Sequence, residues 1–354
     1  MIEFLEAVLP YIKGLWTLPW ILIGFLVTLL LSRFFDEEKI NMVMKKIGLI
    51  LLYFFVPLLL FKIFLSVDFG QKELEFTAVC VIVFSFMYIL AYFFAVYKLK
   101  KMHQPKETKN YFLKTVLTNQ GRSSAFVGGA MLAISEWWIP AAIYMSVGAI
   151  FLFAFIPYIL SYFYKKDMKT SDKDPVHHAL PWYLRVFPWY LLCFAAAAIL
   201  IHGMTDITPR NLGDFGIVFD FFTSLTIPAA LYYVGTGIHP HDLKVDEMKK
   251  LFNVHKQKKS DDHWGGVRNI FFLTVILTPL LTVIVLFPLL LLQIIPKEWF
   301  SVIMINSILP ITSTNMFLVP YGIDKKITAH AITWTTIVCV PIVVLLIYIF
   351  SIYL

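Results

Sequence analysis

Apolar runs of membrane-spanning length dominate this chain. A helix needs about 20 apolar residues to cross the hydrocarbon core of a bilayer. Ten such runs follow one another, near residues 14–34, 44–66, 75–97, 109–135, 138–164, 182–203, 214–238, 268–295, 299–322 and 327–353. Charged residues make up 15% of the chain, against roughly 25% in soluble domains. We therefore predict an all-α polytopic membrane protein with ten transmembrane helices.

The distribution of Lys and Arg predicts how these spans are oriented, because cytoplasmic loops of membrane proteins are enriched in positive charge. With the N-terminus outside, the cytoplasmic segments carry 24 Lys and Arg, the exterior segments carry five, and Arg122 lies within a span. One span too many or too few would place every later segment on the opposite side of the membrane. The unequal distribution of Lys and Arg between the two sides therefore supports ten spans. We expect a plasma-membrane protein with both termini outside. The loops also explain the net charge of +7, so we expect no nucleic-acid partner.

A basic linker divides the spans into two halves. Residues 1–164 hold the first five spans, residues 165–181 form a predicted cytoplasmic linker, and residues 182–354 hold the last five. Because five is odd, the second half enters the membrane from the opposite face, and inverted repeats of this kind are common in transporters. Pro57 and Pro228 occupy matching places in the two halves and are predicted to kink their helices. A single proline is usually a packing kink, whereas the paired placement favours a functional role.

Spans four and nine are interrupted by polar residues at matching depth, in the sequences TNQGRSSAF and LPITSTNMF. Irregular backbone persists at membrane depth only where protein or a water-filled cavity surrounds it. Paired interruptions point to a transport site. Ser and Thr side chains can also hydrogen-bond between packed helices. That role does not explain why a polar interruption occurs at matching positions in both halves of the chain. The candidate substrate-binding residues are Asn119, Gln120, Arg122, Ser123, Ser124, Pro310, Thr312, Ser313 and Asn315.

Arg122 is the residue that indicates the charge of the substrate. A cation at membrane depth is costly and marks a functional site by default. No Asp or Glu lies within residues 110–135 or 299–323, and Asp220 in span seven is the alternative, structural partner. A guanidinium offers two parallel donors that match a carboxylate. We therefore expect the partner of Arg122 to be a small carboxylate substrate.

Three stretches have a recognisable pattern: LPITSTNMFLVPYGIDKKITAHAITWTTIVCVPIVVLL (309–346), TIPAALYYVGTGI (226–238) and SSAFVGGAML (123–132). They resemble the auxin efflux carrier family, which includes plant auxin carriers and bacterial malate and malonate permeases. The last differs from the family pattern, because Ser123 replaces an Asn, Ala125 replaces a Gly and Ala130 replaces a Pro. The resemblance extends over essentially the whole chain, although each motif alone is loose.

The resemblance implies a carrier in which spans four and nine cross in a transport domain. This domain moves, as an elevator, against a scaffold domain made by spans one, two, six and seven. The implied substrate is a small organic anion, such as an auxin-like carboxylate, malate or malonate, and transport is secondary active or facilitative. A homodimer is compatible with this plan.

Sodium coupling is the alternative within the same fold, because bile-acid sodium symporters share it. The two interrupted stretches supply hydroxyls, amides and carbonyls but no carboxylate, and Arg122 would repel a nearby sodium ion. Two cations a few ångströms apart repel by about 4 kcal/mol at an effective dielectric constant near 20. We therefore expect transport that does not need sodium.

Two other classes of protein are also considered. A membrane-embedded acyltransferase would need a buried His with an acidic or Asn partner, but spans one to five contain no His. The second is a ligand-sensing membrane protein built on the transporter fold. The three cysteines lie in apolar runs without zinc-ligand spacing. We therefore expect neither an enzyme, nor a cofactor, nor a metal site.

Overall fold

The computed structural model describes residues 19–66, 70–101, 106–123, 131, 136–170, 182–236, 263–312, 315, 318–319 and 321–353. Within these ranges the regular structure is helical, apart from an isolated β-bridge between Arg122 and Ile311. The prediction of an all-α chain is therefore confirmed for the described part of the protein.

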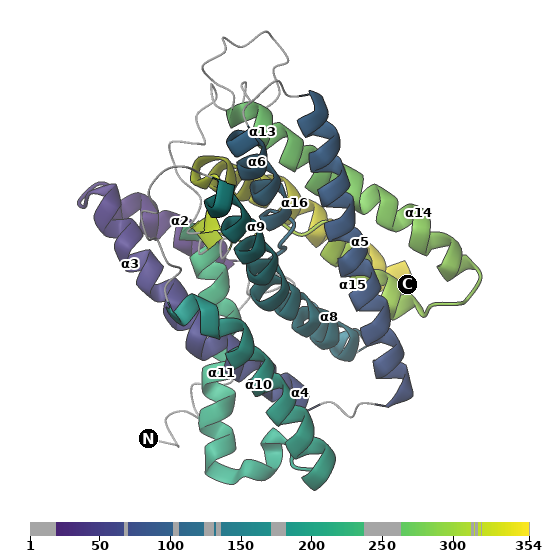
Figure 1. The fold of residues 1–354 in the computed structure, drawn as a ribbon. Helices are drawn as coiled ribbons and strands as arrows, with labels where there is room; N and C mark the ends of the chain where they lie inside the picture. The colour runs from purple at the N-terminus through teal and green to yellow at the C-terminus, as the bar shows by residue number, and fades with distance from the viewer. Residues whose placement is uncertain are drawn as a thin grey trace.

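The helices follow one another along the chain as Figure 1 shows. The α-helices are α2 (Pro19–Leu31), α3 (Glu37–Ile50), α4 (Val56–Leu65), α5 (Gln71–Lys101), α6 (Lys106–Thr118), α8 (Trp138–Ile150), α9 (Ile156–Thr170), α10 (Trp182–Thr205), α11 (Gly213–Thr236), α13 (His263–Phe271), α14 (Thr278–Leu291), α15 (Lys297–Ser307) and α16 (Lys325–Tyr353). Three π-helical segments, η1 (Leu51–Phe55), η2 (Phe151–Phe155) and η5 (Phe272–Leu277), and one 3₁₀ segment, η3 (Pro209–Leu212), join some of them. Every run predicted to span the membrane overlaps at least one of these helices.

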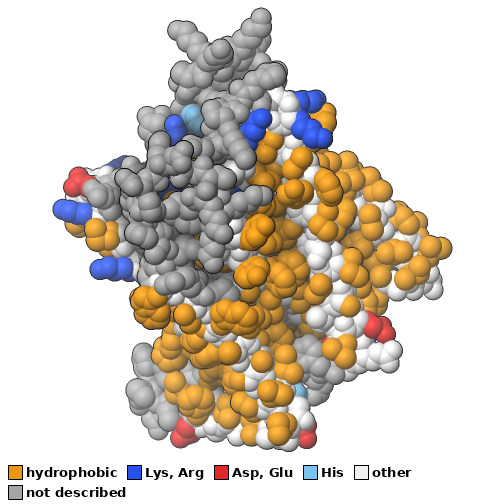
Figure 2. All heavy atoms as spheres, in the orientation of Figure 1, with side chains coloured by type: hydrophobic (Ala, Val, Ile, Leu, Met, Phe, Trp, Pro, Cys, Tyr) orange, Lys and Arg blue, Asp and Glu red, His pale blue; other side chains and the backbone are white. Residues whose placement is uncertain are grey.

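Several of these helices have the length and composition of membrane spans. Four described stretches are long and apolar enough to cross a bilayer: Met42–Leu65, Gln71–Lys101, His263–Leu291 and Lys325–Tyr353. Shorter apolar helices cover Leu22–Leu31, Trp138–Ile150 and Leu192–Thr205. Apolar side chains also cover much of the face in Figure 2, and Leu280, Ile284 and Leu345 are each more than half exposed. Such a large apolar surface is unfavourable in water, and the chain is therefore a membrane-embedded protein.

The helices pack in two groups, which can be followed in Figure 1. The first, called the α2–α11 group, contains α2, α3, α4, α10 and α11, and its buried apolar cluster includes Leu60, Leu65 and Ala198. The second, called the α5–α16 group, contains α5, α6, α8, α9 and α13 to α16, with large buried clusters of its own. Each group draws helices from both halves of the chain, so neither half forms a separate unit.

Within the α2–α11 group, α2 and α11 approach each other to backbone contact. A Cβ added at Gly24 of α2 would lie 2.1 Å from the carbonyl oxygen of Tyr232 in α11. Any side chain at position 24 would therefore separate the two helices. This glycine allows the close approach of α2 to α11.

Small apolar side chains contribute to the contact between the two groups. Ile63 of α4 clusters with Ala142 and Met145 of α8. Ala149 of α8 contributes to the buried cluster of the α2–α11 group. The α5–α16 group thus presents α8 and η2 to its neighbour.

In each of the three π-helical segments, the last residue lies two positions before a proline, so that one residue separates them. Pro57 follows η1, Pro157 follows η2 and Pro279 follows η5. Proline has no N–H and clashes with the carbonyl four residues earlier, and a wider turn relieves that clash. Proline alone does not impose this geometry, because Pro228 lies inside α11 and Pro341 inside α16 without such a segment. Of the two predicted kinks, Pro57 follows a change of helical register and Pro228 lies within a continuous α-helix.

Candidate functional site at the crossing of two broken helices

Two breaks in helical structure meet inside the α5–α16 group. Helix α6 ends at Thr118 and α15 ends at Ser307, and each is followed by irregular backbone. The Ser123 N–H donates to the Pro310 carbonyl at 2.8 Å, and the Thr312 N–H donates to the Gly121 carbonyl at 3.1 Å. These two bonds form the antiparallel bridge between Arg122 and Ile311. We call this meeting of residues 119–123 and 308–315 the crossing.

Gly121 allows the two strands of the crossing to come this close. A Cβ at Gly121 would lie 2.7 Å from Asn315 Oδ1 and 2.5 Å from Leu152 Cδ1. The amide nitrogen of Asn315 also reaches the Gly121 carbonyl, at 3.5 Å. A larger residue at position 121 would push both neighbours away from the crossing.

Threonine side chains from α6 and α16 hold the crossing in place. The Ile311 N–H donates to Thr335 Oγ1 at 3.1 Å, and Asn119 Nδ2 donates to Thr328 Oγ1 at 3.1 Å. The Asp324 N–H donates to Thr115 Oγ1 at 2.8 Å. None of these threonines was a candidate from the sequence. Thr328 and Thr335 are seven residues apart and share one face of α16. This spacing in the sequence could have identified them as residues that contact the crossing.

Arg122 is buried at the crossing, 6% exposed, and its hydrogen-bond acceptors are neutral oxygens. Its Nη2 donates to the Thr274 carbonyl at 3.1 Å and to Gln120 Oε1 at 3.5 Å. Its Nη1 donates to the Leu309 carbonyl at 3.5 Å. No carboxylate in the described ranges forms an ion pair with it. The guanidinium is therefore hydrogen-bonded but not neutralised by the described protein groups.

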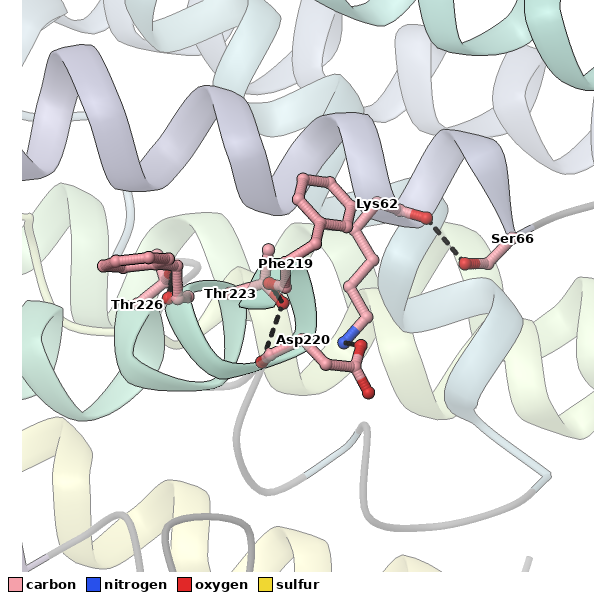
Figure 3. A network of polar contacts seen from close by, with 7 residues as sticks. Lys62, Ser66, Phe219, Asp220, Thr223 and Thr226 are labelled. Carbon is pink, nitrogen blue, oxygen red and sulfur yellow. Dashed lines mark hydrogen bonds and ion pairs between the residues drawn. The ribbon is translucent and has the colours of Figure 1, made fainter. Parts of the chain in front are cut away.

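The structural alternative for Arg122, an ion pair with Asp220, is not formed. Asp220 Oδ1 lies 2.6 Å from Lys62 Nζ, so this pair joins α11 to α4 within the α2–α11 group. Figure 3 shows the two side chains pointing toward each other from neighbouring helices. Both side chains are about a quarter exposed, at 25% and 28%. The partner of Asp220 is therefore Lys62, within the α2–α11 group, and not Arg122.

Half of the buried side-chain polar atoms without a hydrogen-bond partner belong to residues of the crossing, namely Asn119, Gln120, Arg122 and Asn315. Among the described residues the whole set of such atoms is Thr118 Oγ1, Asn119 Oδ1, Gln120 Nε2, Arg122 Nε, Tyr144 OH, Ser301 Oγ, Asn315 Oδ1 and Trp334 Nε1. An unsatisfied buried polar group costs about 1–3 kcal/mol, so such a concentration requires an explanation. These atoms can supply donors and acceptors to a polar ligand.

A second buried cation lies one turn before the crossing. Lys114 was assigned to a cytoplasmic segment from the sequence, but its side chain is only 5% exposed. Its Nζ lies beside Gly322, where a Cβ would come within 2.9 Å of it. Gly322 has φ +80°, which favours glycine and lets the chain turn around the lysine head. Lys114 is thus buried against protein close to the crossing.

The crossing brings together most of the candidate residues named from the sequence. Asn119, Gln120, Arg122 and Asn315 contribute side chains, whereas Ser123 and Thr312 contribute backbone N–H groups and Pro310 contributes a carbonyl. Ser124 and Ser313 lie outside the described residues.

Comparison with known proteins leaves the family open. No protein-family model matches the chain, and no curated protein matches it. The assignment of a function therefore rests on the geometry of the crossing together with the sequence patterns.

Proposed function

We propose that this chain is an elevator-type carrier of ten spans in two inverted repeats, which transports a small organic anion such as a mono- or dicarboxylate across the cytoplasmic membrane. The auxin efflux carrier family is the proposed relationship, on the motifs quoted above. One observation carries the proposal: the described contacts of the buried Arg122 guanidinium are made to neutral oxygens.

The charge of Arg122 selects the sign of the substrate. Arginine keeps its proton in proteins, and a buried charge without an opposite charge is strongly unfavourable. A carboxylate placed beside the Nε atom would supply both the missing charge and the missing acceptor. Gln120 Nε2 and Tyr144 OH, which also lack partners, can donate further hydrogen bonds to the same ligand. A cationic substrate would meet repulsion at this position.

The division into two helix groups supports movement of one group against the other. The crossing lies within the α5–α16 group, while the α2–α11 group is packed through backbone contact at Gly24. Small side chains such as Ala142 and Ala149 contribute to the contact between the groups.

The distribution of charge supports the proposed orientation. Figure 2 shows Lys and Arg side chains at the upper end of the visible face, whereas Asp and Glu side chains lie mainly toward the lower end. Basic residues lie at the C-terminal end of α5, at Lys98, Lys100 and Lys101. This end is the proposed cytoplasmic side.

The test is uptake of mono- and dicarboxylates into proteoliposomes containing the purified protein. We expect Arg122→Ala to abolish uptake of the transported anion while the protein still inserts and purifies. Arg122→Lys should recover little, because lysine lacks the planar fork of donors. Lys72→Ala, which removes an exposed cation from the start of α5, is the matched control and should transport normally.

Three outcomes would contradict the proposal. Normal uptake by Arg122→Ala would make this residue structural. Binding of carboxylates without uptake would favour the ligand-sensing alternative. Absence of both binding and uptake across the panel would leave the acyltransferase alternative as the next to test.

A further inference from the structure

The π-helical segment η5 leaves one backbone carbonyl without a helical donor. The N–H of Thr278, which follows η5, donates to the Leu273 carbonyl five residues earlier. The Thr274 carbonyl therefore loses the donor that an α-helix would give it. The next donor in this register would be residue 279, but Pro279 has no N–H. Local sequence thus exposes an acceptor at membrane depth.

Arg122 takes this acceptor. Its Nη2 lies 3.1 Å from the Thr274 carbonyl, whereas its other two acceptors lie at the outer limit of hydrogen bonding, 3.5 Å. N–H···O hydrogen bonds in proteins usually measure about 2.7–3.2 Å, so the Thr274 carbonyl is the principal anchor of the guanidinium. With Nη2 held in this way, the Nε atom remains without a partner.

A related contact occurs in the α2–α11 group with a different donor. The Tyr53 carbonyl, four residues before Pro57 rather than five, accepts a hydrogen bond from the Tyr190 hydroxyl at 3.0 Å. This hydrogen bond joins η1 to α10, and both partners are neutral. A side chain from another helix thus reaches a carbonyl of a π-helical segment in both groups, and in η5 that side chain carries a positive charge.

We propose that Pro279 is a positioning residue for substrate recognition, which acts by keeping the Thr274 carbonyl available to the Arg122 guanidinium. The proposal rests on the proposed role of Arg122 in binding an anion. With an N–H at position 279, the π-helical register would continue to the Thr274 carbonyl and compete with Arg122. The guanidinium would then lose its principal anchor without any change in its own side chain.

The first test is the KM for carboxylate uptake by Pro279→Ala in proteoliposomes. We expect KM to rise roughly tenfold, the effect of losing one hydrogen bond to a charged group, with a smaller change in maximum rate. Pro157→Ala is the matched control, because Pro157 follows η2 with the same spacing and the N–H before it, of Ile156, also donates five residues back. The KM of Pro157→Ala should stay within twofold of the wild-type value.

The second test needs no substrate and measures thermal stability in a double-mutant cycle of Arg122→Ala and Pro279→Ala. In the Arg122→Ala protein the Thr274 carbonyl loses its donor, and an N–H at position 279 can replace it. The double variant should therefore have a higher Tm than the sum of the two single changes predicts. Arg122→Ala combined with Pro157→Ala should be additive. Pro279→Leu supplies the same N–H and serves if the alanine variant inserts poorly.

The two proposals fail in distinguishable ways. If Arg122→Ala abolishes uptake but Pro279→Ala keeps the wild-type KM and the cycle is additive, the positioning role of Pro279 is wrong. If Arg122→Ala leaves uptake unchanged, the proposed function itself is wrong, and the stability cycle still reports whether Pro279 acts through the Thr274 carbonyl.

Discussion

The polar side chains of the two helix groups are paired to different extents. In the α2–α11 group, Lys62 and Asp220 form an ion pair, and the Tyr53 carbonyl is satisfied by Tyr190. In the α5–α16 group, Arg122 contacts neutral oxygens, and all the unpartnered buried polar atoms of the described residues lie in this group or in its breaks. Unsatisfied polar groups are retained where a structure binds or moves something. The contrast therefore assigns the scaffold role to the first group and the binding role to the second, as a proposal that mutations can test.

After the loss of uptake expected for Arg122→Ala, the next largest effect is expected from filling the space at Gly121. Gly121→Ala places a Cβ 2.7 Å from Asn315 Oδ1 and 2.5 Å from Leu152 Cδ1, so the side chains of Asn315 and Leu152 must shift. We expect carboxylate uptake to fall more than roughly tenfold, because even about 1.4 kcal/mol of lost binding has that effect. The measurement is initial uptake rate at a fixed amount of inserted protein.

Gly203→Ala in α10 is the control for this substitution, since nothing lies within 4 Å of its added Cβ. It should transport normally and be slightly more stable, because alanine favours helix over glycine by about 1 kcal/mol. Equal uptake by the two alanine variants would mean that the crossing is not the binding region.

Breaking the Lys62–Asp220 ion pair of the α2–α11 group should lower the stability of the protein and leave carboxylate uptake unchanged. Because both side chains are about a quarter exposed, Lys62→Ala should lower the free energy of unfolding by only about 1 kcal/mol. Thermal unfolding in detergent measures this change, and the carboxylate KM should equal the wild-type value. A large rise in KM would place Lys62 in the transport machinery and remove the contrast between the groups.

The smallest expected effect is that of sodium. The crossing offers amide oxygens of Asn119 and Asn315 without partners, and Asp324, which follows it, accepts the Ile327 N–H at the start of α16. Because the positive charge of Arg122 belongs to the same crossing, we expect these oxygens to bind a sodium ion only weakly. Replacing sodium by choline at constant pH and membrane potential should leave the initial uptake rate unchanged. A several-fold fall would establish the sodium-coupled alternative.

The all-α membrane class and the positions of the helices were predictable from the sequence, because apolar runs of about 20 residues have few other solutions. The crossing residues were also identifiable, since polar clusters such as the one around Arg122 interrupt two runs at matching depth. The π-helical segments were not, because Pro57, Pro228 and Pro341 look alike in sequence and differ only in their surroundings. The burial of Lys114 depends on its contact with Gly322, more than two hundred residues later, which no local pattern reveals.

The contact between Gly24 and Tyr232 has a consequence for how the protein is made. Helix α2 leaves the ribosome long before α11, the helix whose backbone it touches. The crossing has the same property, since Arg122 and the Leu309 carbonyl are 187 residues apart. Domains fold as units during synthesis only when their contacts are local in sequence. The first half of this chain therefore enters the bilayer with α2 and the α6 break facing lipid or a chaperone, and both must wait for partners from the second half.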